Sequence, residues 1–432
     1  MSIPISTEEP QERAVLVGAP IKGISSETAR EHLEELGRLT DTAGANVVGT
    51  LTQWVDSPHP RYYIGEGKAR ELKEMVEETG AGLVIFDDDL SPAQGKNLEN
   101  LLKVRIVDRT ELILDIFATR ARTSEAQTQV ELAQLQYMLP RLKRMWTHLE
   151  RVRGGIGMRG PGETQLETDR RLIGRRIRDL KAKLALMAQR RATQRKARSR
   201  EFRVSLVGYT NAGKSSMLRA LSGSEVFVED RLFATLDPST RIVDLGNGDT
   251  VLLTDTVGFI RKLPHHLVAS FRATLEEARE ADVLLHVIDA SHPGWEEQKQ
   301  VVEEVLEDLG ASDRPTFLVL NKVDRLTHEE EAAFRERAAS VFAQPFVFAS
   351  TVEEGGLDEV RELLRRELRA QRPEVRLQIP VIDGEALATV YREGEVVTRE
   401  ENGVTIELVA RLPRPALGRL RRRAGVNVIG SV

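Results

Sequence analysis

The sequence predicts a multidomain α/β protein: two α/β domains separated by a long α-helical hairpin, followed by a small α+β domain. Three observations predict this. The chain has 432 residues, about three times the usual domain length. Short apolar runs alternate with helical patterns in two separate stretches, which is typical of parallel sheets. Between them lies a long helical periodicity broken by glycines. We expect domains at 1–122, 123–200, 201–371 and 372–432.

The composition narrows the class of protein. Hydrophobic residues make up 41% and charged residues 30%, as in globular proteins. The absence of cysteine excludes disulfides, cysteine zinc sites, iron–sulfur clusters and cysteine nucleophiles. The N-terminus, MSIPISTEEPQER, has neither a basic nor an apolar leader region, and no run of 18 apolar residues occurs. We therefore expect a cytoplasmic protein with no membrane span, and peripheral association with a membrane stays open. We also expect a monomer.

The first domain should be a small parallel α/β domain. The expected strands are AVLVGA, VVGTLTQWV, GLVIFDD and VRIVDRT, and the expected helices are SSETAREHLEELGRLT, GKARELKEMVEETG and SPAQGKNLENLL. Gly65 and Gly67 precede Lys68 in a segment that lacks the ending of a phosphate-binding loop. Turn glycines are the favoured interpretation and a second nucleotide site the alternative.

The second segment should be an antiparallel helical hairpin. Ser124 and Gln127 fit a capping box, and Pro140 predicts a kink. The first arm has an apolar seam of Leu132, Leu135, Leu139, Leu142, Trp146 and Leu149. The second arm, from about Glu163, carries on one face Ile173, Ile177, Leu180, Leu184 and Met187.

The glycine-rich segment 154–162 between the arms cannot continue a helix. It is longer than a plain connection needs and includes Ile156 and Met158. We favour a functional probe at the hairpin tip over a flexible connection.

Positive charge is concentrated in the predicted hairpin. Residues 141–200 contain 19 Lys and Arg against 5 Asp and Glu, whereas the parts before and after are both acidic. Such a basic segment indicates a polyanionic partner, usually nucleic acid, with a solvated helical face as the alternative. The candidate contacts to RNA are Gly155, Ile156, Gly157, Met158, Arg159 and Gly160 at the tip, and Arg170, Arg171, Arg175, Arg176 and Arg178 on the arm.

The third domain carries a phosphate-binding motif in the context that it requires. The apolar run FRVSLVG leads into GYTNAGKS and then into a helical segment. Backbone N–H groups and the helix N-terminus would hold phosphates, Lys214 would reach the β- and γ-phosphates, and Ser215 would bind Mg²⁺. The predicted loop residues are Gly208, Tyr209, Thr210, Asn211, Ala212, Gly213, Lys214 and Ser215.

Two further segments complete the phosphate side. TVLLTDT delivers Asp255, Thr256, Val257 and Gly258 at a strand end, where Asp255 would hold Mg²⁺ through water and Gly258 would meet the γ-phosphate. In the segment Phe233, Ala234, Thr235, Leu236 and Asp237, the threonine fits a switch residue that closes on Mg²⁺, with an ordinary loop threonine as the alternative. We assign catalytic roles to Lys214, Thr235 and Gly258.

The segments expected to contact the nucleotide base indicate guanine. TFLVL delivers Asn321, Lys322, Val323 and Asp324, and an Asp carboxylate accepts from guanine N1–H and the 2-amino group but opposes adenine. A surface turn is the alternative for this motif alone. Ala349, Ser350 and Thr351 end another short strand where a backbone contact to the guanine oxygen is expected. After DTVG stands Phe259, which has no donor or acceptor to position water, so unaided hydrolysis should be slow.

These motifs resemble the HflX family of ribosome-associated GTPases. The matching pieces include YYIGEGKA, GGIGMRGPGETQLETDRRLI, GYTNAGKS, FATLDP, DTVGF and NKVD, over about residues 14–370. One departure is Ala349-Ser350, where the family has Ser-Ala. The resemblance implies GTP and GDP binding with Mg²⁺, and a partner in the 50S subunit and 70S ribosome through 23S rRNA. It also implies splitting of stalled or hibernating ribosomes and hydrolysis stimulated by the ribosome.

Two other functions stay open from the sequence. One is an RNA-binding GTPase that acts in ribosome assembly or surveillance without splitting subunits. The other is a P-loop ATPase or small-molecule kinase, against which the NKVD segment argues. The last 60 residues, with a basic Arg419–Arg423 cluster, predict no function.

Overall fold

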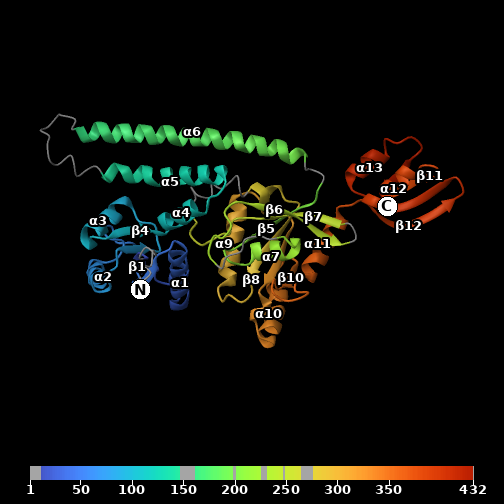
Figure 1. Ribbon diagram of the computed structural model, residues 1–432. Coiled ribbons are helices and arrows are strands. Elements are labelled where there is room, and N and C mark those ends of the chain that lie inside the picture. Colours follow the sequence, from blue (N-terminus) through green and yellow to red (C-terminus); the bar gives the residue numbers. More distant parts are fainter. Residues whose placement is uncertain are drawn as a thin grey trace, which may run out of the picture.

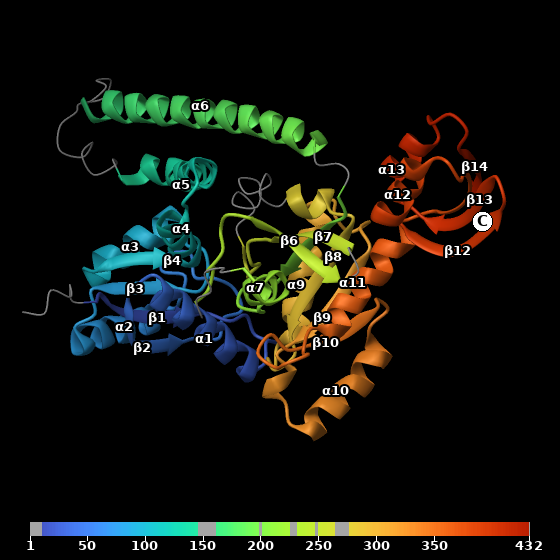
Figure 2. The ribbon, with the colours of Figure 1, turned by 45° about the vertical axis from the view of Figure 1, so that its right-hand side comes forward.

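The computed structural model describes residues 11–145, 161–197, 201–224, 231–246, 249–263 and 276–431 (Figure 1). It contains three sheets in chain order, and the multidomain α/β architecture is confirmed. Two long helices run side by side along one edge of the molecule, and the C-terminal sheet lies at the end opposite the N-terminal one (Figures 1 and 2).

The N-terminal sheet is four-stranded and parallel, in the order β2-β1-β3-β4. Its strands are β1 (Arg13–Gly18), β2 (Asn46–Thr52), β3 (Leu83–Phe86) and β4 (Arg105–Asp108), and its helices are α1 (Ser26–Thr42), α2 (Glu66–Thr79), α3 (Pro92–Leu102) and α4 (Arg109–Arg120). Helices α2 and α3 share one apolar core, and α1 and α4 share another with the following domains. Helix α4 is an addition to the predicted pattern: the Asp108 side chain accepts from the Glu111 backbone and begins a helix directly after β4.

The hairpin consists of α5 (Ser124–Met145) and α6 (Pro161–Ala197). The predicted capping box of Ser124 and Gln127 is wrong. The Thr123 hydroxyl accepts from the Ala126 backbone instead, and the Gln127 side chain donates to the Ala121 carbonyl. Pro140 lies inside α5. The predicted inner face of α6 is confirmed, with Leu180 only 2% exposed. Trp146, Leu149 and the tip residues Gly155, Ile156, Gly157, Met158, Arg159 and Gly160 lie outside the described residues.

The first arm of the hairpin is fixed to the N-terminal domain. Beyond Pro140, Arg141 donates to the Asp108 carboxylate at 2.9 Å and to the Leu90 carbonyl at 3.0 Å. The same guanidinium lies over the Tyr137 ring, 3.4 Å from its centroid. An arginine held by these hydrogen bonds and by an aromatic ring contributes more to the stability of the folded state than an exposed ion pair does.

The third domain has a six-stranded sheet in the order β10-β9-β8-β5-β7-β6, parallel except for the β6–β7 pair. Its strands are β5 (Arg203–Gly208), β6 (Ser239–Gly246), β7 (Asp249–Asp255), β8 (Val283–Asp289), β9 (Thr316–Asn321) and β10 (Phe346–Ala349), and its helices are α7 (Lys214–Ser222), α9 (Trp295–Asp308), α10 (His328–Val341) and α11 (Asp358–Ala370). The carboxyl ends of β5, β7, β9 and β10 meet at one edge, so the four predicted motifs come together there.

The C-terminal sheet is antiparallel, in the order β12-β13-β11-β14. It contains β11 (Glu374–Pro380), β12 (Glu395–Asn402), β13 (Thr405–Arg411) and β14 (Asn427–Ser431), with α12 (Gly384–Glu393) and α13 (Arg414–Leu420). Within the Arg419–Arg423 cluster, Arg423 pairs with Asp383 and Glu385, and Arg419 with Glu393. None of the described helices is long and apolar enough to cross a bilayer.

Candidate functional site

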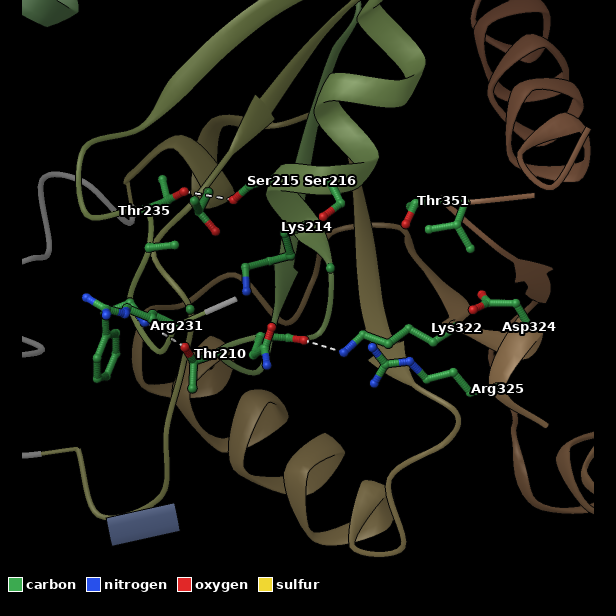
Figure 3. Close-up of a pocket in the computed structure, with 17 residues that line it drawn as sticks. Thr210, Lys214, Ser215, Ser216, Arg231, Thr235, Lys322, Asp324, Arg325 and Thr351 are labelled. Atoms are coloured by element: carbon green, nitrogen blue, oxygen red, sulfur yellow. Dashed lines mark hydrogen bonds between the residues drawn. The ribbon is translucent and has the colours of Figure 1, made fainter. Parts of the chain in front are cut away.

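A cavity of about 290 Å³ lies at the edge where the parallel strands of the third domain end (Figure 3). It lies between the loop after β5 and the loops after β7 and β9. The residues that line it are Thr210, Asn211, Gly213, Lys214, Ser215, Ser216, Arg231, Phe233, Ala234, Thr235, Thr256, Gly258, Lys322, Asp324, Arg325, Thr351 and Val352. Ser216, Arg231, Arg325 and Val352 were missing from the sequence-based site.

Three glycines allow the close backbone approach that forms the cavity. A Cβ on Gly213, which has a φ of 101°, would lie 2.2 Å from the side-chain amide nitrogen of Asn321. A Cβ on Gly208, with a φ of 151°, would lie 2.3 Å from the Val287 carbonyl oxygen. At Gly258 it would lie 2.7 Å from the Thr210 Cα. Side chains at these positions would push apart the loops that surround the cavity.

Lys214 begins α7 and is almost fully buried. Its ammonium donates to the Gly208 carbonyl at 3.1 Å and the Tyr209 carbonyl at 2.8 Å. Burial lowers the pKa of Lys214 to about 8, against the opposing effect of the Asp255 carboxylate. An anion in the cavity would give this buried cation a strong partner.

Three oxygen-bearing side chains meet beside Lys214. The Ser215 hydroxyl lies 2.7 Å from the Thr235 hydroxyl and donates to the Asp255 carboxylate at 2.6 Å. The other Asp255 oxygen is buried and has no hydrogen-bond partner among the described residues. This set fits Mg²⁺, which takes oxygen ligands from few protein groups and completes its shell with phosphate and water. The predicted ligands Ser215 and Thr235, with Asp255 behind them, are therefore together.

The base side of the cavity is fixed by contacts between loops. The Asn321 amide donates to the Ala212 carbonyl at 2.9 Å, and Lys322 donates to the Asn211 carbonyl at 2.8 Å and to Asp289 at 2.7 Å. Lys322 has a φ of 64°, which turns the chain after β9.

Asp324 reaches the cavity with one carboxylate oxygen held in place. The Ser350 hydroxyl donates to that oxygen at 2.7 Å, while Ser350 itself is 1% exposed. Thr351, not Ser350, lines the cavity. Among the residues 349–351 left open by the sequence, Ser350 thus orients Asp324 and Thr351 faces the cavity.

Several predicted nucleotide-binding residues lie away from the cavity. Leu236 and Val257 are buried in the core that joins the domains. The Asp237 carboxylate accepts from the backbone of Arg122 and Thr123 at the start of α5. Gly208, Ala212, Val323 and Ala349 act through the backbone path of their loops and do not line it. Leu236, Asp237 and Val257 had been included because they stand within motif segments, whereas Gly208, Ala212 and Ala349 had been included for their backbone.

Phe259, the residue after Gly258, is fully buried. Its backbone pairs with the phosphate loop, since Thr210 N–H donates to its carbonyl at 2.7 Å and its own N–H donates to the Gly208 carbonyl at 3.1 Å. Its ring belongs to the interdomain core and does not reach the cavity.

A buried ionic cluster, absent from the sequence-based site, lies behind the phosphate loop. Arg109 is 1% exposed and pairs with Asp87 and Glu35 of the N-terminal domain. Arg261, two residues after Phe259, donates to Asp87 at 3.1 Å. The Tyr209 hydroxyl donates to Glu35 and accepts from the Arg261 backbone, and burial raises its pKa. The N-terminal domain therefore holds both the phosphate loop and the segment after Gly258.

The described arginines of α6 differ in their surroundings. Arg170, Arg171, Arg175 and Arg178 are exposed. Arg176 is different, because its guanidinium makes a two-bond ion pair with Glu131 of α5, at 2.6 and 2.8 Å. This residue was grouped with the others by sequence, but in the structure it joins the two arms.

Three family models match consecutive parts of the chain. They are described as GTP-binding GTPase N-terminal (residues 30–118), GTP-binding GTPase Middle Region (120–198) and 50S ribosome-binding GTPase (203–322). A solved GTP-binding protein from Sulfolobus solfataricus in complex with GDP is 25% identical, with a TM-score of 0.45, and the match covers 83% of this chain and 98% of that one.

Full-length relatives carry the name GTPase HflX. The protein from Caldanaerobacter subterraneus is 47% identical over 92% of this chain and 90% of its own length. The Escherichia coli protein is 44% identical over 89% of this chain and 90% of its own. The Flavobacterium psychrophilum protein is 51% identical over 73% of this chain and 76% of its own. With the three matched regions and the cavity described above, this similarity shows that the chain belongs to the HflX family of GTPases and is a GTP hydrolase.

Proposed function

We propose that this GTPase binds the 50S ribosomal subunit in the cytoplasm and splits stalled or hibernating 70S ribosomes, acting as a monomer. The family model matched by residues 203–322 is described as a 50S ribosome-binding GTPase. The observation that carries the proposal is helix α6, a long basic rod that packs along α5. Helix α6 has 37 residues, which at 1.5 Å per residue is about 55 Å.

The rod fits an RNA backbone better than a protein groove. Four of its described arginines, Arg170, Arg171, Arg175 and Arg178, are exposed, and guanidinium groups bind phosphates through paired hydrogen bonds. The contacts proposed for 23S rRNA are Arg170, Arg171, Arg175 and Arg178, with the tip residues 155–160 beyond them.

The GTPase site would work through the following assignments. Lys214 binds the β- and γ-phosphates, and Ser215 and Thr235 hold Mg²⁺ with Asp255 behind them. The metal, when bound, neutralises phosphate charge. Gly258 offers its backbone N–H to the γ-phosphate, and Asp324 selects guanine. None of these side chains positions water, so we propose that the ribosome supplies or orders that group.

Sucrose-gradient centrifugation of 70S ribosomes with the protein and GTP tests the function. We expect separation into 30S and 50S particles that requires GTP binding. A variant lacking residues 155–161 should bind GTP and some 50S but leave 70S particles intact. Normal splitting by this variant would show that the tip is only a connection.

A second candidate function is supported by the same rod. An RNA-binding GTPase of ribosome assembly or surveillance would also need a basic arm and a guanine site. In the gradient assay such a protein would migrate with 50S particles and leave the 70S peak unchanged.

A further inference from the structure

Switch I, defined here as residues 231–237, is packed against the start of the hairpin instead of lying free at the surface. Phe233 is 1% exposed, and its ring meets Phe117 of α4 edge-on with centroids 4.6 Å apart. Leu236 is 2% exposed in the core that also contains Ala126 and Val130 of α5. Switch I therefore packs in one core with α4 and the first turns of α5.

Asp237 adds a polar connection at the same place. Its carboxylate accepts from the backbone N–H groups of Arg122 at 3.1 Å and Thr123 at 3.2 Å, and from the Thr123 hydroxyl. These donors directly precede α5, which begins at Ser124 and whose N-terminus carries partial positive charge, so a carboxylate is favoured there. Asp237 thus holds, from a different domain, the two residues that lead into the first arm, including Thr123, whose hydroxyl accepts from the Ala126 backbone.

The same segment also contacts a predicted Mg²⁺ ligand of the phosphate loop, Ser215. Only Leu236 separates Asp237 from Thr235, whose hydroxyl lies 2.7 Å from Ser215. Because Leu236 is held in the core, Thr235 has little freedom to move without Asp237 and the start of α5. In GTPases, contacts with the γ-phosphate and Mg²⁺ order switch I, and hydrolysis releases it.

We propose that Asp237 couples the nucleotide state to the orientation of the hairpin, as a positioning residue between Thr235 and helix α5. When Thr235 is held by the metal, Asp237 holds the first arm at one angle to the six-stranded sheet. When Thr235 is released, the contact of Asp237 with residues 122–123 weakens. The arm, together with the N-terminal domain to which Arg141 fixes it, then takes a wider range of orientations relative to the six-stranded sheet. Because coupling between two sites is reciprocal, a partner that fixes the hairpin would favour the GTP state. The proposal concerns the isolated protein and does not depend on ribosome splitting.

The absence of cysteine makes a direct distance measurement possible. Spin labels are placed on cysteines introduced at two exposed positions, Leu172→Cys on α6 and Val341→Cys on α10, which are 52% and 56% exposed. Double electron–electron resonance then gives the distance distribution with Mg²⁺ and either GDP or a non-hydrolysable GTP analogue. We expect a narrower distribution with the analogue than with GDP.

The deciding variant is Asp237→Ala in this labelled protein. It should show the same broad distribution with both nucleotides, while its affinity for GDP stays within about twofold of the parent, since Asp237 does not line the cavity. Asp237→Asn should restore part of the difference, because the amide oxygen still accepts from backbone N–H groups. Asp313→Ala, at an exposed position of the same domain, should behave like the parent.

Two results would overturn the coupling. One is an unchanged distribution between GDP and the analogue in the parent protein under saturating nucleotide. The other is a full nucleotide-dependent difference in Asp237→Ala. Nucleotide titration of each variant separates both from a simple failure to bind, and circular dichroism separates them from unfolding.

Discussion

Replacing Asp87 with asparagine should destabilise the contact between the N-terminal domain and the GTPase domain. Asp87 follows β3 and is 4% exposed. It accepts from Arg109 at 2.8 Å, from Arg261 at 3.1 Å and from Lys262 at 3.0 Å. Asparagine keeps the size of the side chain but removes the negative charge that three cations surround.

The size of the effect follows from the pKa of this carboxyl. Burial acts to raise the pKa, but Arg109, Arg261 and Lys262 outweigh it and hold the pKa at about 2, below the usual 3.8. At about 1.4 kcal/mol per pKa unit, the charged form stabilises the folded state by about 2 kcal/mol. Because the folded-state pKa is lowered, this stabilisation is complete above about pH 4 and is lost as the pH falls towards 2.

Urea unfolding followed by tryptophan fluorescence measures this cost. At about pH 7, Asp87→Asn should lower the free energy of unfolding by about 2 kcal/mol, and its stability should fall less steeply than the parent's between about pH 4 and 2. The matched control is Asp56→Asn, since Asp56 pairs with Lys22 at the surface and its side chain is 78% exposed. We expect at most about 0.5 kcal/mol for the control.

The reasoning would be refuted by equal stability of Asp87→Asn and the parent. It would also be refuted if Asp87→Asn and the parent lost stability equally steeply between about pH 4 and 2, since the lowered pKa is the source of the predicted energy. A loss of stability as large in the Asp56 control would show that the cluster has no special role.

Three other predictions concern the GTPase site and the rod. Asp324→Asn should lower the affinity for GTP by at least about tenfold, because two charge-assisted hydrogen bonds to guanine are lost, and should gain binding of xanthine nucleotides. Unchanged GTP affinity in a titration would contradict the assignment. Replacing Arg170, Arg171, Arg175 or Arg178 of α6 with serine should reduce the slope of log K against log salt for 50S binding by roughly 0.7 to 0.9 per residue. Arg176→Ser should instead loosen the hairpin through loss of the Glu131 ion pair; equal slopes for all five variants and the parent would contradict this prediction. Addition of 50S or 70S should raise kcat for GTP hydrolysis by at least about tenfold, or roughly 1.4 kcal/mol, since the buried Phe259 cannot position water; rapid hydrolysis without ribosomes would contradict this.

The sequence by itself determined the parts whose signal lies in neighbouring residues. GYTNAGKS, DTVG and NKVD each follow an apolar strand, and parallel strands bring their carboxyl ends to one edge, so the cavity could be predicted before any coordinates. The inner face of α6 was equally clear, because a period of 3.6 places Ile173, Ile177 and Leu180 on one side.

The tertiary structure alone decided the contacts between distant segments. Asp237 had been grouped with the nucleotide-binding residues because it stands two residues after Thr235, yet its partners lie about 115 residues earlier, just before α5. Arg109 reaches Glu35, 74 residues away, and Tyr209 reaches the same carboxylate across 174 residues. A charged or polar side chain carries no mark in the sequence of which distant partner will satisfy it. The packing of α1 against α4 brought Arg109 to Glu35, and the packing of the N-terminal domain on the GTPase domain brought Tyr209 to the same carboxylate. Burial then required each of these groups to find a partner.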